Sequence, residues 1–119
     1  MAITNNYEIK IKTRGFNESP IAIVTLTFEE RIEIRYAPIH WKNKRTEIFF
    51  TMPSLGQLGF KRCVVLLDKD EYRKLTIEVL KKFKEVAQEK YLKEEVELLN
   101  KLIDERIKLI NETPSDLQI

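Results

Sequence analysis

Residues 48–68, IFFTMPSLGQLGFKRCVVLLD, divide the chain into two halves. An apolar strand ends at Pro53-Ser54, a glycine-marked loop follows, and a second apolar run leads to Asp68. Asp68, with Glu71 three residues later, matches the capping box that opens a helix. The residues before Asp68 have the patterns of strands, and nearly all those after it have helical periodicity. The sequence therefore predicts an α+β fold, a small antiparallel sheet of four to five strands followed by a long C-terminal helical segment.

The strands are predicted from alternation of apolar and polar residues, which indicates one buried and one wet face. The predicted strands are 7–12, 21–28, 31–36 and 48–52, and residues 60–67 are either a fifth strand or a short extended segment. In the third strand, alternation places Tyr36 on the buried face together with Ile32 and Ile34. Pro38 cannot donate to a ladder, so it puts the end of this strand at an edge or a bulge. We expect a polar hairpin loop over residues 40–47.

The helical half carries two apolar stripes separated by a phase break around residues 88–90. The first stripe is Tyr72, Leu75, Val79, Phe83 and Val86, and the second is Leu92, Val96, Leu99, Ile103, Ile107 and Ile110. An unbroken helix of about 43 residues would be roughly 65 Å long, too long for so small a sheet to cover. The second stripe must therefore fold back after a bend or pair with a partner chain.

The length of 119 residues predicts a single domain. Residues 7–67 form its sheet part, 68–112 its helical part with a second half that could serve oligomerisation, and 113–119 a tail. The single cysteine, Cys63, excludes an internal disulfide and a cysteine-ligated zinc site. The chain starts without the pattern of a signal peptide and has no apolar run long enough to span a membrane. We therefore expect a soluble, cytoplasmic protein without a membrane partner.

Chemistry-bearing motifs are missing from the sequence. It has one histidine, His40, no carboxylate cluster at ligand spacing, no glycine-rich phosphate loop and no Ser/His/Asp set. Capping accounts for the acidic residues near Asp68. We therefore predict that the protein is not an enzyme and takes no cofactor, no metal and no small-molecule substrate.

The charge is uneven along the chain. Residues 1–67 carry ten Lys/Arg against six Asp/Glu, whereas residues 68–119 carry eleven against thirteen. A basic sheet joined to a mildly acidic helical part favours contact between a polyanion and the sheet.

Two segments are candidates for nucleic-acid contact. They are Trp41-Lys42-Asn43-Lys44-Arg45, in which a ring adjoins three cations, and the basic step Lys61-Arg62. Cations neutralise phosphates and a ring can stack on an unpaired base. The alternative for the first segment is a solvated hairpin with Trp41 folded onto the sheet. The alternative for Lys61-Arg62 is two solvent-facing residues at the end of a strand. Arg31 and Arg35 could share an exposed face with Lys10 and Lys12, which is either a binding face or only a wet one.

Several segments resemble the stage V sporulation protein G family, the septation regulators of bacteria. They are residues 20–28 (PIAIVTLTF), the hairpin Lys42-Asn43, residues 48–54 (IFFTMPS), and Gly59-Phe60-Lys61. The resemblance covers roughly residues 7–90 and depends most on the Met-Pro-Ser strand. It implies a small antiparallel sheet with a C-terminal helix, forming a dimer that binds DNA or RNA.

The predicted function is thus a nucleic-acid-binding regulatory protein that acts as a homodimer or higher oligomer. Its predicted contacts are Trp41, Lys42, Lys44, Arg45, Lys61 and Arg62. The alternative is a protein–protein interaction or oligomerisation module that does not bind nucleic acid. Salt-dependent nucleic-acid affinity separates the two, because only the first requires it.

Overall fold

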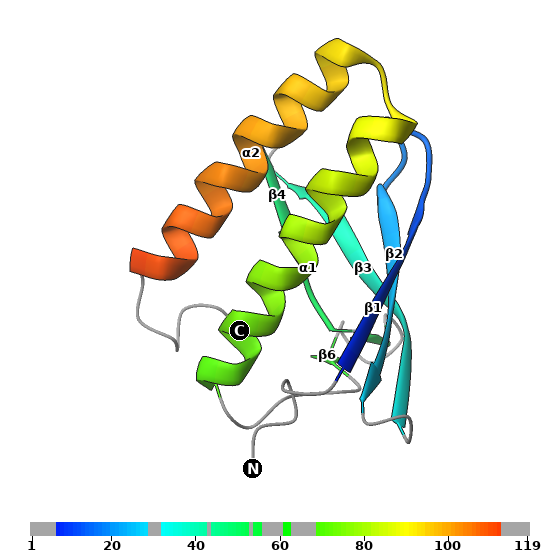
Figure 1. The fold of residues 1–119 in the computed structure, drawn as a ribbon, viewed down its shortest axis with the longest axis vertical. Helices are drawn as coiled ribbons and strands as arrows, with labels where there is room; N and C mark the ends of the chain where they lie inside the picture. The colour runs from blue at the N-terminus through cyan, green and yellow to red at the C-terminus, as the bar shows by residue number, and fades with distance from the viewer. Residues whose placement is uncertain are drawn as a thin grey trace.

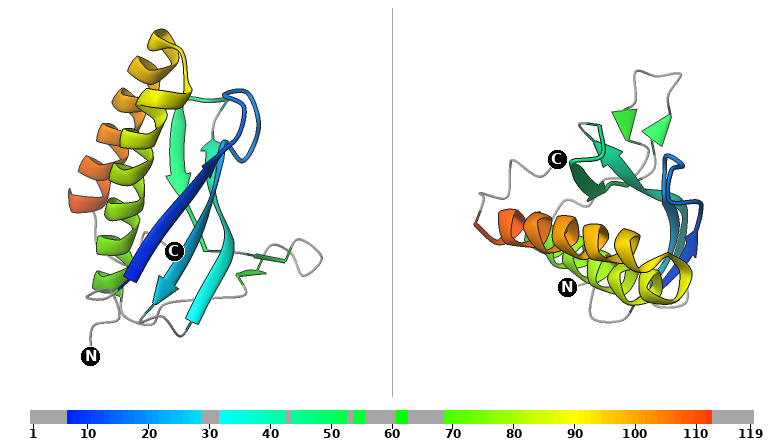
Figure 2. Two further views of the ribbon diagram at one scale, coloured as in Figure 1. Left: turned by 45° about the vertical axis from the view of Figure 1, so that its right-hand side comes forward. Right: turned by 90° about the horizontal axis from the view of Figure 1, so that it is seen from above.

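A computed structural model describes residues 7–28, 32–42, 44–52, 54–55, 61–62 and 69–112. The elements are β1 (Tyr7–Thr13), β2 (Ala22–Phe28), β3 (Ile32–Lys42), β4 (Glu47–Phe50), β5 (Ser54–Leu55), β6 (Lys61–Arg62), α1 (Lys69–Lys90) and α2 (Lys93–Glu112). Strands β1 to β4 form an antiparallel sheet in chain order, and β5 and β6 pair as a separate small ladder. The two helices lie side by side against one face of the curled sheet (Figures 1 and 2). The predicted α+β fold is confirmed, while the capping residue Asp68 lies outside the described residues.

The core lies between the sheet and the helices. In β2 the residues Ala22, Val24, Leu26 and Phe28 are buried, and the residues between them are only partly covered. They meet the first helical stripe, in which Leu75, Val79 and Phe83 have no exposed surface. This confirms the predicted alternation of β2 and the predicted inward face of α1.

Strand β3 departs from the prediction. It does not end near Pro38 but continues through it to Lys42. The register with β2 shifts between Val24 and Leu26, so that Arg35 and Tyr36 together oppose Thr25. Two residues opposite one are a β-bulge, which reverses the inside–outside phase of the strand. The prediction that Tyr36 faces the core is therefore wrong, since its side chain is 71% exposed.

The bulge also determines which face of the sheet Pro38 occupies. It leaves Ala37 and Ile39 buried and Pro38 on the opposite face, paired with Ile23. The Pro38 carbonyl accepts a hydrogen bond from Thr51 N at 3.2 Å. Residues 40–42, predicted as hairpin loop, therefore belong to the strand, and the connection to β4 is shorter than expected.

The helical half bends at Tyr91 and Leu92, directly after the predicted phase break, and α2 runs back along α1 (Figure 1). Leu92 N donates to Glu95 Oε1 at 3.0 Å, the backward half of a capping box at the start of α2. Four residues of α2 are buried, namely Leu99, Leu102, Ile103 and Ile110. Lys84 Nζ and Asp104 Oδ1 form an ion pair between the helices at 2.8 Å.

The fold-back is one of the two arrangements that the sequence left open for the second stripe. The chain itself buries Leu99, Ile103 and Ile110 of this stripe, whereas Leu92 remains 67% exposed. Of the helices described, neither combines the length and the apolarity that crossing a bilayer requires.

Candidate functional site

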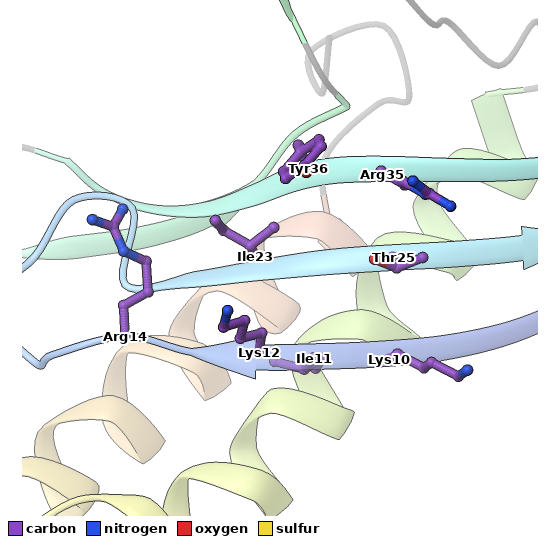
Figure 3. A pocket seen from close by; sticks show the side chains of 8 residues that line it. All are labelled: Lys10, Ile11, Lys12, Arg14, Ile23, Thr25, Arg35 and Tyr36. Carbon is purple, nitrogen blue, oxygen red and sulfur yellow. The ribbon is translucent and has the colours of Figure 1, made fainter.

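The face of the sheet opposite the helices carries a basic hollow with a cavity volume of about 430 Å³. Its lining residues are Lys10, Ile11, Lys12, Arg14, Ile23, Thr25, Arg35 and Tyr36 (Figure 3). The cross-strand register pairs Lys10 with Thr25 and Lys12 with Ile23, which sets the two β1 lysines beside a floor contributed by β2. Among these described lining residues, four are cations and none is a carboxylate. We call this surface the basic hollow.

Carboxylates surround the hollow without lining it. Lys10 Nζ lies 3.8 Å from Glu8 Oε1, and Arg14 Nη2 lies 3.1 Å from Glu18 Oε1. Arg35 Nε donates to Glu33, and this bond raises the pKa of the guanidinium. Exposed ion pairs of this kind are weak, because water and salt screen them. A phosphate can therefore compete with these carboxylates for the cations.

Arg14 is held in place by the loop between β1 and β2. Gly15 N donates to Glu18 Oε2 at 2.6 Å, and this bond, with the charge of Arg14, lowers the pKa of the Glu18 carboxyl. From the helix bend, the Tyr91 hydroxyl donates to the Arg14 carbonyl at 2.5 Å. Burial raises the pKa of the Tyr91 hydroxyl. The helical half thus fixes one rim of the hollow.

Trp41, the predicted stacking ring, lies in β3 on the helix-facing side of the sheet. Its cross-strand partner is the buried Ile48. Its Nε1 donates to the Phe16 carbonyl at 3.0 Å, and the two rings meet edge to face with centroids 5.2 Å apart. The ring is half-buried in this packing, which agrees with the alternative that Trp41 folds onto the sheet. Its contact with a base stays a prediction.

The other hairpin cations occupy different surroundings. Lys42 ends β3 and its Nζ lies 5.4 Å from the centre of the Phe49 ring. Lys44 and Arg45 are exposed in the turn with φ of 55° and 67°. Arg45 binds the β1–β2 loop through Asn17, with Nη1 2.6 Å from Oδ1 and Nη2 2.9 Å from the carbonyl. Arg45 therefore ties two loops together, whatever else it contacts.

Lys61 and Arg62 form β6, which pairs with β5 away from the main sheet (Figure 2). Their side chains, like Arg31 and Cys63 as a whole, lie outside the described residues. The predicted roles of Lys61 and Arg62 on phosphate stay predictions.

His40, the single histidine, lies on the outer face near the end of β3. Its ring stacks on Phe49 with centroids 4.9 Å apart, and its Nε2 lies 2.9 Å from Thr51 Oγ1. Within the described part of the chain, no three His, Cys, Asp or Glu residues gather closely enough to hold a metal ion.

A second concavity lies between β4 and α2, with a volume of about 250 Å³. It is lined by Thr46, Glu47, Ile48, Leu102, Glu105, Arg106 and Leu109. Burial lowers the pKa of Arg106, and the charge of Glu47 partly opposes that shift. Leu109 remains 47% exposed at the rim. We call this surface the β4–α2 groove.

No family model, curated protein or solved structure matches this chain.

The predicted set of binding residues does not include the residues that line the basic hollow. Arg14 and Tyr36 were not considered, and Lys10, Lys12 and Arg35 were considered as a shared face but left out of the set. A signal for Tyr36 was present. The apolar positions of β3 change from even numbers at Ile34 to odd numbers at Ala37 and Ile39. Such a phase change within one strand indicates a bulge, and it would have moved Tyr36 to the outer face.

Proposed function

We propose that this protein binds nucleic acid, DNA or RNA, through the outer face of its sheet and acts as a cytoplasmic regulatory protein. The observation that carries the proposal is the basic hollow, where Lys10, Lys12, Arg14 and Arg35 converge with no carboxylate among the described lining residues. Lys42 and Lys44 extend the positive charge toward the hairpin. A groove of one charge sign attracts a polyanion and releases the counterions of its phosphates.

The charge distribution over the molecule supports the same face. Helix α1 has acidic residues in its first turn, and so does α2. The helical half of the sequence is net negative, whereas the half that includes the sheet is net positive. Helices α1 and α2 together carry eleven Lys/Arg and eleven Asp/Glu, so their net charge is zero. The positive charge of the sheet half is therefore what attracts a polyanion.

The test measures affinity for labelled single-stranded and duplex oligonucleotides by fluorescence anisotropy, between about 50 and 200 mM salt. Neutralising Lys10, Lys12 and Arg35 to Gln should weaken binding to every sequence. It should also flatten the plot of log affinity against log salt by roughly two to three units, at about 0.7–0.9 for each phosphate that is no longer neutralised. The hairpin variant with Lys42, Lys44 and Arg45 changed to Gln tests the predicted hairpin contacts in the same way.

A matched control changes three exposed helical lysines, Lys74, Lys81 and Lys101, to Gln. It removes the same charge from the other side of the molecule and should leave the salt slope unchanged. If the outer-face variant binds as well as the parent at both salt concentrations, the basic hollow is not a nucleic-acid site.

The second candidate function is a protein–protein interaction module. The observation in its favour is the β4–α2 groove, because β4 is the last strand of the described sheet and Leu109 is exposed beside it. An edge strand next to an apolar rim can accept a strand from a partner, including a second copy of this chain. Homodimerisation is proposed here on this edge rather than on the second apolar stripe, because Leu99, Ile103 and Ile110 of that stripe are buried within the chain.

A further inference from the structure

We propose that Tyr36 is a base-stacking platform, so that the basic hollow selects single-stranded over duplex nucleic acid. This inference rests on the proposed function, since it names the form of nucleic acid that the same surface takes. Three large apolar or aromatic side chains are strongly exposed in the described part of the chain, and of these Tyr36 alone is aromatic. It stands on the rim of the hollow with its ring directed away from the helices (Figure 3).

Packing does not explain a tyrosine at this position. The side chain is 71% exposed, so its ring contributes little to the core. Its backbone adopts a φ of 63°, in the left-handed region where a bulky side chain is uncommon and where Gly or Asn fits more readily. A residue held in an unfavourable backbone conformation without burial of its ring is a candidate for a binding role.

The bulge that produces this conformation also places the ring among the cations. Because Arg35 and Tyr36 together oppose Thr25, both side chains stand on the outer face instead of on opposite faces. Lys10 and Lys12 lie on the same face in β1, across the intervening strand β2. Adjacent strands are about 4.8 Å apart, so roughly 10 Å separates β1 from β3.

An aromatic ring flanked by cations is suited to a single strand. The phosphates of a flexible strand can follow the lysines and arginines while one base turns onto the ring, and stacking of this kind tolerates any base. In a duplex the base faces are covered by their neighbours in the stack, so Tyr36 would meet only the backbone. An acidic peptide could satisfy the cations but offers no flat π face to the ring.

The experiment compares Tyr36→Asn and Tyr36→Phe with the parent chain. Asn accepts the left-handed backbone and removes the ring, whereas Phe keeps the ring, so thermal melts should show both variants folded. Tyr36→Asn should lose about five- to a hundredfold in affinity for a labelled oligothymidine or oligouridine. Its affinity for a duplex and its salt slope should not change. Tyr36→Phe should stay close to the parent.

An abasic single strand supplies the matched ligand control. The parent should bind it about as weakly as Tyr36→Asn binds the normal strand, and Tyr36→Asn should lose nothing further, because the stacked base is already absent. The stacking role would be overturned if Tyr36→Asn lost as much affinity for duplex as for single strands, or lost none. It would also be overturned if the parent bound polyglutamate as tightly as the single strand. A parent chain that binds no nucleic acid at either salt concentration would instead reject the proposed function itself.

Discussion

The helix-facing side and the outer side of the sheet are formed by the same four strands with different chemistry. The inner side packs against the helices and carries fully buried residues such as Val24, Leu26 and Ile39. The outer side carries lysines, arginines and one strained aromatic residue around an open hollow. The difference separates the residues that hold the fold from those that are free to serve binding. Substitutions on the two sides should therefore change different measurements.

The largest expected contrast is between Phe83→Ala and Lys12→Gln. Phe83 has no exposed surface and contacts the Tyr91 ring with centroids 6.5 Å apart. Its truncation should cost about 3–5 kcal/mol of the free energy of unfolding. Lys12 is exposed in β1, so its neutralisation should stay within about 0.5 kcal/mol. A denaturant titration measures both. Equal small losses would mean that the inner side is not buried as described.

The next contrast tests whether α2 is covered by its own chain. Ile103→Ala should cost about 2–5 kcal/mol, since Ile103 is fully buried. Leu92→Ala should cost at most about 0.5 kcal/mol, because that side chain is 67% exposed at the bend. Both losses should be independent of protein concentration. A loss from Ile103→Ala that changes with protein concentration would show that a partner chain contributes to the cover of the stripe.

These contrasts also separate what the sequence could predict from what it could not. The inner side of β2 was predictable because its residues alternate without interruption from Ala22 to Phe28. Tyr36 was misplaced because strict alternation was extended through a bulge. The change of phase between Ile34 and Ala37 indicated a bulge in the sequence, but only pairing with Thr25 of another strand defines its position. Periodicity likewise revealed the apolar face of α2, but it could not show whether the same chain or a partner covers that face.

The basic hollow, too, was predictable only in part. Lys10, Lys12 and Arg35 were recognisable as exposed positions of their strands. Their convergence depends on the β1–β2–β3 register, and Arg14 depends on a loop held by Tyr91 from the distant helix bend. Local patterns identify such residues singly, whereas tertiary pairing brings them together.

The smallest expected effect concerns the Glu18 carboxyl at the rim of the hollow. The hydrogen bond from Gly15 N is the main cause that holds its pKa below the ordinary value of 4.5, and Arg14 is the second. Because the folded pKa is depressed, the carboxylate stabilises the loop above the unfolded value, and this contribution is lost as the pH falls through the folded pKa. Carboxyl carbon shifts followed by NMR should report the low value. Arg14→Gln should raise it only partly, since the Gly15 bond remains. A full return to 4.5 in Arg14→Gln would show that the arginine, and not the turn, sets the charge of this rim.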